Sequence, residues 1–242
     1  MAVSGDPIDV DVQATWPEST IRWAEEHANR LIDSTEFVVD LAISPKQEDE
    51  FRQTFGPRKL VAYHCARLLP HEADTIRTGG LRLLDEQLVR DRIADATVHG
   101  SLSDAARRQA ETGNVYAIRN TQGRAGQICF VIGRTAFDES PAGCDPLLRH
   151  WGGEAIRGGP SDVPALATLG TPSIVVATLN LTRCHNDPYS WPALGKIFVG
   201  TVLGLDDRSG AVHYLEPVPG RDVLAIWQPD DAEYDRHPQL PR

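Results

Sequence analysis

Apolar residues recur every three or four positions near the start of the chain, which predicts an amphipathic helix with one buried face. These residues are Ile21, Ala24, Ala28, Leu31 and Ile32. Thr15 and Glu18 have the spacing of a capping box, so we expect the helix to begin there, with Pro17 in its first turn. A short, charged helix is predicted around 45–55.

Short runs of β-branched and apolar residues predict strands along the rest of the chain. They cover 37–43, 59–65, 115–118, 127–132, 173–181, 196–202, 212–215 and 223–227. After the second of these runs, Pro70 opens a helix that Gly79 and Gly80 close. Ser101 then stands three residues before Asp104, a spacing typical of a helix N-cap. Because helices and strands do not alternate regularly, the pattern predicts a mixed α+β fold and not a doubly wound sheet.

The chain is expected to form a single domain with short extensions. Residues 1–14 are predicted to be a flexible arm, 15–58 a helical and β lead-in packed on the core, 59–230 the main α+β domain and 231–242 a C-terminal tail. No stretch approaches the about 18 uninterrupted apolar residues of a membrane helix, and the first residues lack the basic and apolar regions of a signal peptide. These features predict a cytoplasmic protein without membrane contact.

The formal net charge of −10 argues against a broad basic face of the kind that binds nucleic acid. The four cysteines form no CxxC pair, so we expect reduced thiols and neither a disulfide framework nor a zinc ribbon. Cys184, His185 and Asp187 offer metal ligands, but no second cluster accompanies them and a turn before Pro188 explains the pattern better. No metal is expected. Gly123 to Gly126 is interpreted as a hairpin loop and not a phosphate-binding loop.

Three short segments carry residues suited to chemistry. His64 stands in the segment 63–67 at the end of a predicted strand, Tyr116 follows a glycine turn, and Glu154 stands beside two glycines and apolar neighbours. Each has a plain structural interpretation as well. His64 can be a hydrogen-bonded core histidine and Tyr116 a half-buried strand tyrosine. Glu154 is either a surface acid or a functional one, because an unpaired carboxylate in apolar surroundings is costly.

In chain order, these segments resemble the ADP-ribosyltransferase fold, in its diphtheria-toxin and poly(ADP-ribose) polymerase branch with a His–Tyr–Glu signature. Tyr63-His64-Cys65-Ala66 followed by Gly79-Gly80-Leu81 is similar to the family's Y-H-G-[ST] motif and the helix ending at G-L. Gly113-Asn114-Val115-Tyr116-Ala117 is similar to its tyrosine motif. The resemblance covers roughly 59–156 and implies a split β-sandwich of short mixed strands.

The resemblance implies that NAD is the substrate and that ADP-ribose moves to a macromolecular acceptor, either nucleic acid or a protein site other than arginine. Glu154 would stabilise the positive charge that develops on the ribose, as in glycoside hydrolysis. His64 would hold a ribose hydroxyl and Tyr116 would stack on the nicotinamide ring, so both join Glu154 in the catalytic set. Arg67 would contact the pyrophosphate, although it can equally be an exposed charge. Cys65 would lie at the nicotinamide amide, where the family has glycine.

Several alternatives stay open at this point. Gly152 stands where arginine-specific relatives carry an acceptor-orienting acid or amide, which disfavours arginine as the acceptor. Water as the acceptor would make the protein an NAD glycohydrolase, and loss of turnover would make it a binding or interaction protein of the same fold. A toxin or defence effector with an antitoxin or other regulatory partner fits the resemblance. A Cys65 thiol nucleophile activated by His64 is disfavoured, because neighbouring residues of a strand point to opposite faces and cannot pair directly.

Overall fold

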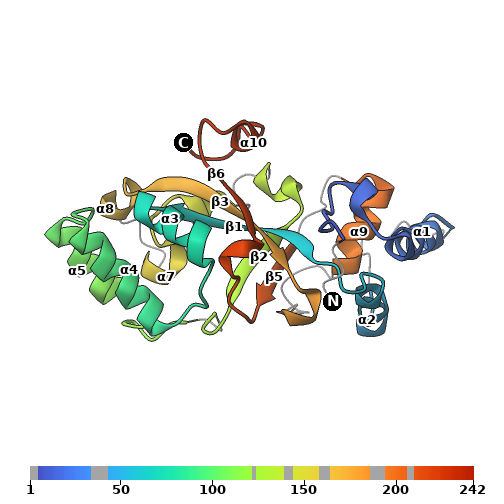
Figure 1. The fold of residues 1–242 in the computed structure, drawn as a ribbon, viewed down its shortest axis with the longest axis horizontal. Helices are drawn as coiled ribbons and strands as arrows, with labels where there is room; N and C mark the ends of the chain where they lie inside the picture. The colour runs from blue at the N-terminus through green and yellow to red at the C-terminus, as the bar shows by residue number, and fades with distance from the viewer. Residues whose placement is uncertain are drawn as a thin grey trace. The chain divides into compact units, whose positions relative to one another are not determined.

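The computed structural model describes residues 5–33, 43–121, 124–138, 144–157, 164–185, 194–205 and 210–242. Its helices within these ranges are α1 (Glu18–Asp33), α2 (Pro45–Gln53), α3 (Pro70–Gly79), α4 (Glu86–Val98), α5 (Asp104–Gly113), α6 (Asp145–Leu148), α7 (Gly153–Arg157), α8 (Pro164–Ala167), α9 (Leu194–Leu203) and α10 (Ala232–Asp235) (Figure 1). Its strands are β1 (Leu60–Leu68), β2 (Ile128–Ile132), β3 (Thr171–Leu179), β4 (Cys184–His185), β5 (Gly210–Tyr214) and β6 (Val223–Trp227).

The strands of the described ranges form a six-stranded sheet with the order β4-β5-β2-β1-β3-β6. Strand β3 pairs with β6 in antiparallel register, Val175 lying opposite Ile226, and β4 pairs with β5 in the same sense. This sheet and its helices confirm the α+β class. The chain divides into two compact units, and β1, β2 and β3 each contribute residues to both. The first unit comprises 1–62, 130–136 and 178–214, and the second comprises 63–129, 137–177 and 215–242.

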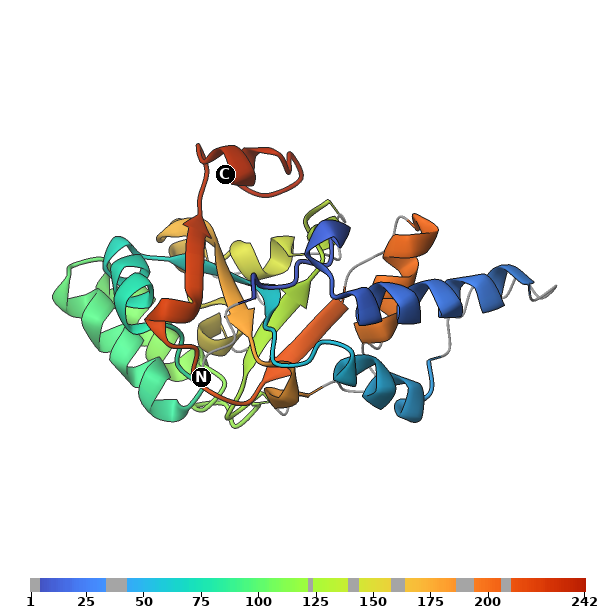
Figure 2. The same cartoon turned by 45° about the vertical axis from the view of Figure 1, so that its right-hand side comes forward.

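The first unit has an aromatic core among three helices. Helices α1 and α2 both pack on α9, and the three helices are grouped together in Figures 1 and 2. The ring of Phe198 on α9 lies 4.6 Å from that of Trp16 and 5.0 Å from that of Phe51, centroid to centroid. Ile8 and Val10, which belong to the segment predicted as an arm, are buried, and Ile8 pairs with Leu60 in a parallel bridge.

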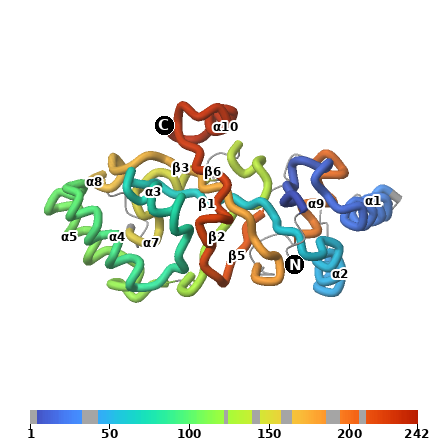
Figure 3. The backbone as a smooth tube through the Cα atoms, viewed as in Figure 1, coloured from blue at the N-terminus to red at the C-terminus, as the bar shows by residue number. Residues whose placement is uncertain are grey.

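The second unit packs short helices around Trp151. Helix α5 contacts α4, α7 and α8, and Figure 3 traces α4 and α5 running beside each other. The apolar cluster between them contains Leu69, Val89, Ile93, Ala96, Ala106, Ala110, Trp151, Ile156 and Leu166. Helix α3 contacts β6. This cluster fixes α4 and α7, the two helices that supply most of the charged residues of the candidate site.

Two predicted helix caps are wrong, although the helices themselves are confirmed. Thr15 ends a 3-10 helix, Gln13–Thr15, and its hydroxyl donates to the Val12 carbonyl, while the first hydrogen bonds of α1 reach the Pro17 carbonyl. The capping box with Glu18 therefore does not form, and Glu18 pairs with Arg22 instead. At α5 the cap is Ser103 and not Ser101, because the Ser103 hydroxyl accepts from the Ala106 amide.

Two predicted strands are wrong. The run 196–202 lies in α9, where Ile197, Phe198 and Val199 are all buried. In a continuous apolar run, the spacing of apolar residues does not distinguish a buried helix from a buried strand. Here the segment forms a helix that packs against α1 and α2. The run 115–118 is a turn, because the Asn114 side chain accepts from the amides of Tyr116 and Ala117 and holds them in a turn conformation.

The remaining strand predictions are confirmed within a few residues at β1, β2, β3, β5 and β6, and the helix predictions at α2 and α3 are confirmed as well. Strand β1 runs on to Leu68, so His64 lies in the middle of the strand and not at its end. The strand predicted at 37–43 falls outside the described residues except for its last residue. Gly123 of the predicted hairpin loop and Asp187 of the metal-ligand pattern also lie outside them. No described helix is both long enough and apolar enough to cross a bilayer.

Candidate functional site

A pocket of about 280 Å³ lies wholly within the second unit. Its walls come from β1, from α3, from the segment that joins α3 to α4, from α4 itself and from the segments 124–129 and 147–155. The polar and charged residues that line it are His64, His71, Glu72, Thr75, Arg82, Asp91, Arg92, Asp95, Arg124, Gln127 and Glu154. Of the residues singled out in the sequence, His64, Cys65 and Glu154 line this pocket. Tyr116 and Arg67 are not part of its lining.

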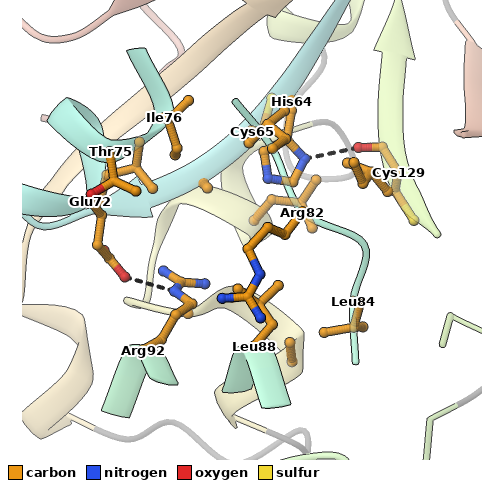
Figure 4. Close-up of a pocket in the computed structure, with 18 of the residues that line it drawn as sticks. His64, Cys65, Glu72, Thr75, Ile76, Arg82, Leu84, Leu88, Arg92 and Cys129 are labelled. Atoms are coloured by element: carbon orange, nitrogen blue, oxygen red, sulfur yellow. Dashed lines mark hydrogen bonds and ion pairs between the residues drawn. The ribbon is translucent and has the colours of Figure 1, made fainter. Parts of the chain in front are cut away.

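His64 enters the pocket from the middle of β1 (Figure 4). Its Nδ1 donates a hydrogen bond of 3.0 Å to the carbonyl of Cys129. Burial lowers the pKa of His64, the hydrogen bond opposes this shift, and the charge of Arg92 adds to it. The ring is therefore neutral at pH 7. Because Nδ1 carries the proton, Nε2 is the acceptor nitrogen, which suits a contact with a hydroxyl group.

Glu154 stands at the start of α7 and forms an ion pair with Arg124, the two side chains being 37% and 36% exposed. Gly152 and Gly153, which precede it, have φ values of +76° and +51°. A Cβ on Gly152 would stand 2.4 Å from the side chain of Ile156. The turn that aims Glu154 into the pocket therefore requires glycine at 152. This gives a physical reason for the absence of an acid at that position.

Glu72 is the buried acid of the pocket wall. One of its carboxylate oxygens accepts from Arg92 Nε at 2.7 Å, and the other accepts from the Leu69 amide and from Trp151 Nε1, each at 2.8 Å. Burial alone would raise the pKa of Glu72, but the charge and hydrogen bond of Arg92 and the other two donors hold it below its ordinary value. The carboxylate is ionised, and it fixes Arg92 over the Trp151 ring, 5.4 Å from the ring centroid.

Arg82 reaches the pocket from the segment after α3. Its Nη1 donates to Asp91 at 2.7 Å, and Gln87 donates to the second oxygen of the same carboxylate at 2.7 Å. The hydrogen bond from Arg82, and then that from Gln87, lowers the pKa of Asp91. Arg82 is placed by Gly80, whose φ is +88° and where a Cβ would stand 1.8 Å from the Val218 carbonyl oxygen. The next residue, Leu81, exchanges both backbone hydrogen bonds with Val218.

Sequence reasoning missed Glu72, Arg82, Arg92 and Arg124. Glu72 had a local signal, since an acid at the third position of a helix that Pro70 opens is typical of a capping residue. Arg92 had none, because its partner lies on another helix and only the tertiary structure joins them.

Tyr116 lies in the turn after α5 and not on a strand. It packs against the apolar cluster of the second unit and borders a separate hollow between α4 and α5. Its hydroxyl donates to the carbonyl of Leu84 at 3.2 Å, and Leu84 does line the pocket with His64 and Glu154. The structure therefore brings two of the three signature residues, His64 and Glu154, together in one pocket. Tyr116 is linked to that pocket only by its hydrogen bond to Leu84.

Arg67 and Cys65 are both engaged in the fold. Arg67 donates to the carbonyls of Leu169 and Leu148, at 2.7 and 3.3 Å. A hydrogen bond with Cys144, followed by burial, raises the pKa of the Cys65 thiol well above its ordinary value. The thiol is protonated at neutral pH, which argues against a nucleophile at this position.

Cys184 is the first of the three metal ligands that the sequence offers. It is buried, with its Sγ 3.7 Å from the Asn180 carbonyl oxygen, and burial raises the pKa of its thiol to about 12. Across the ranges that the structure describes, no three His, Cys, Asp or Glu side chains gather as a metal site would require.

Comparison of the chain with protein-family models, with curated proteins and with solved structures found no match.

Proposed function

We propose that the chain binds NAD in the pocket of the second unit and cleaves the bond between nicotinamide and ribose, passing ADP-ribose to an acceptor. The observation that carries the proposal is that His64 and Glu154, far apart in the chain, line one pocket in the order and with the residue types of the ADP-ribosyltransferase signature. The split β-sandwich of that family is part of the same proposal. The described strands belong to one sheet, so the support comes from the site and not from the fold.

The residue types suit the reaction. The bond between ribose C1′ and the nicotinamide nitrogen breaks with its electron pair leaving on nicotinamide, and positive charge develops on the sugar. The carboxylate of Glu154 stabilises that charge, which is an electrostatic effect of about 3–4 kcal/mol when the group is held in place. The acceptor then forms a bond to C1′ and loses its proton to solvent. The neutral ring of His64 orients a ribose hydroxyl through its acceptor nitrogen.

Tyr116 has a positioning role in this proposal. Its hydroxyl holds the Leu84 carbonyl, and Leu84 belongs to an apolar strip of the pocket wall together with Ile76 and Leu81. A nicotinamide ring is flat and largely apolar on its faces, so this strip gives it a suitable contact surface. The Tyr116 ring lies at the hollow between α4 and α5 and not in the pocket lining, so it could stack only on a nicotinamide ring that reached that hollow.

The acceptor we propose is a nucleic acid or a protein side chain other than arginine. The glycine required at position 152 leaves no acid there to orient a guanidinium substrate. Two further functions are distinguished by the same experiment. Water as acceptor would make the protein an NAD glycohydrolase, and an ion pair between Arg124 and Glu154 that stays closed when NAD is bound would make it a binding protein without turnover.

The test is to incubate the full chain with NAD labelled on its adenine, in the presence of protein and nucleic-acid fractions, and to measure nicotinamide release and label incorporation together. Release with incorporation into either fraction supports the transferase. Release without incorporation identifies the glycohydrolase. NAD binding without release identifies the binding protein, and incorporation into free arginine would refute the exclusion of arginine acceptors.

A further inference from the structure

The pocket contains buried polar atoms that have no partner. Arg92 Nη2 and His71 Nε2 are both buried, and neither has a hydrogen-bond partner in the part of the chain that the structure describes. Both residues line the pocket. Buried polar groups in folded proteins are nearly always hydrogen-bonded, and a guanidinium nitrogen left without an acceptor is costly. A ligand acceptor would satisfy the guanidinium nitrogen of Arg92.

The acids of the pocket wall do not fill this need. Both oxygens of Glu72 already accept hydrogen bonds, and they engage Arg92 through Nε alone. Asp91 accepts from Arg82 Nη1 on one oxygen and from Gln87 on the other. The buried carboxylate of Glu72 thus holds one edge of Arg92, the more exposed carboxylate of Asp91 pairs with one edge of Arg82, and the other N–H groups of both arginines are left for a ligand.

Two guanidinium groups from different elements enter the same pocket. Figure 4 shows the side chain of Arg92 rising from α4 beside Glu72, and that of Arg82 descending from the segment after α3. Arg82 bonds to Asp91, the residue next to Arg92 in the chain, so the two cations are anchored at neighbouring positions of α4. The N–H groups that the two acids do not engage can therefore bind one anion in this pocket.

We propose that Arg82 and Arg92 form a binding site for the diphosphate group of a nucleotide. A diphosphate presents several oxygens over two charged centres, which matches two planar guanidinium forks better than a single carboxylate does. Ile76, Leu81, Leu84 and Leu88 line the same pocket, so a nucleoside joined to the diphosphate, which is the nicotinamide half in the proposed function, meets an apolar surface beside the anion. Arg67, the arginine expected from the sequence to bind pyrophosphate, donates instead to two backbone carbonyls.

This inference deepens the proposed function and rests on it only in naming NAD, whose two halves are joined by a diphosphate. The inference that the pocket binds a nucleotide diphosphate holds whether or not the protein cleaves that nucleotide. The site is tested by calorimetric titration of the full chain with ADP, adenosine and inorganic pyrophosphate. We expect ADP to bind at least about tenfold more tightly than adenosine, because each charge-assisted hydrogen bond contributes strongly.

The variants are Arg82→Gln, which removes a half-exposed charge, and Arg92→Lys, which keeps a cation beside Glu72 but loses the planar fork. Each should weaken ADP binding about tenfold and leave adenosine binding unchanged. Arg90→Gln is the matched control, because Arg90 lies on the same helix, pairs with Glu86 and does not line the pocket. It should leave both affinities unchanged. Pyrophosphate should compete with ADP, because it presents the same anion to the two arginines, and its failure to compete would overturn the diphosphate site.

Equal affinity for ADP and adenosine, absence of ADP binding, or an unchanged ADP affinity in Arg82→Gln would overturn the diphosphate site. These results are separable from those on turnover. If ADP binding follows the expected pattern but NAD releases no nicotinamide, the proposed function fails and the site stands. If nicotinamide is released with the same KM for NAD in Arg82→Gln as in the wild type, the site fails and the proposed function stands.

Discussion

The carboxylate of Glu154 is paired with the guanidinium of Arg124 in the pocket wall, and both groups remain more than one-third exposed. Ion pairs with this exposure contribute little to stability, because water solvates both charges when the pair opens. The pair can therefore separate when a ligand enters. A buried acid such as Glu72, whose side chain is 9% exposed, has no such freedom. This difference separates the acid proposed to act on substrate from the acid that holds the wall.

The first prediction follows from that exposure. Glu154→Gln and Arg124→Gln should each change the free energy of unfolding by no more than about 1 kcal/mol. Urea denaturation followed by tryptophan fluorescence measures this. A loss of several kcal/mol in Glu154→Gln would identify Glu154 as a structural acid and remove it from the catalytic set.

Glu72 should behave in the opposite way. Glu72→Gln should destabilise the protein by about 3–5 kcal/mol at pH 7, because it leaves the charge of Arg92 uncompensated in the pocket wall. The same denaturation measurement applies, with Glu50→Gln as a control, since Glu50 is half exposed and pairs with Lys46. A loss below 1 kcal/mol in Glu72→Gln would contradict the account of the wall.

The contribution of Glu72 depends on pH. Its pKa in the folded protein lies below the ordinary value of 4.5, so the folded state favours the ionised form more than the unfolded state does. The stabilisation is therefore fully present above about pH 4.5 and is lost as pH falls through the folded pKa. We expect the stability difference between wild type and Glu72→Gln to be constant from pH 6 to 8 and to shrink below about pH 4.5. A difference that grows as pH falls would have the wrong sign.

Tyr116→Phe tests the link between Tyr116 and the pocket. Removing the hydroxyl should lower stability by about 1 kcal/mol and raise the KM for NAD severalfold, because the Leu84 carbonyl loses its donor. Tyr234→Phe is the matched control: the Tyr234 hydroxyl also donates to a backbone carbonyl, that of Pro241, which does not line the pocket. It should lose stability with no change in KM. Equal KM values in the two variants would exclude a positioning role for Tyr116.

The two adjacent glycines at the end of α3 should differ sharply. Gly80→Ala should destabilise the protein by about 2–4 kcal/mol, because an alanine there combines a positive φ with a Cβ inside contact distance of the Val218 carbonyl. Gly79→Ala, which meets no atom within 4 Å, should be neutral or mildly stabilising. Thermal denaturation of the pair provides the comparison. Similar melting temperatures would show that the turn before Arg82 is not constrained as described.

The sequence was most informative where local chemistry decides structure. Pro70 and Gly80 bounded α3 as predicted, because a fixed φ and a positive φ are properties of single residues. It was least informative where tertiary contacts decide. The apolar run at Phe198 became a helix because α1 and α2 pack on it. Tyr116 lies in a turn and not in the expected strand, because the Asn114 side chain accepts a hydrogen bond from the Tyr116 amide. Arg92 and Glu72 lie on different helices, so no spacing in the sequence predicts their ion pair.

The central claim is that Glu154 stabilises charge in the cleavage of NAD, and the most direct measurement is kcat/KM for nicotinamide release by Glu154→Gln. Gln keeps the size of the side chain and removes its charge, so we expect a loss of about 10²–10³ in kcat with NAD binding nearly intact. Glu111→Gln is the control, because Glu111 forms a similarly exposed ion pair with Arg107 away from the pocket, and its rate should equal that of the wild type. A Glu154→Gln protein that releases nicotinamide at the wild-type rate would contradict the account.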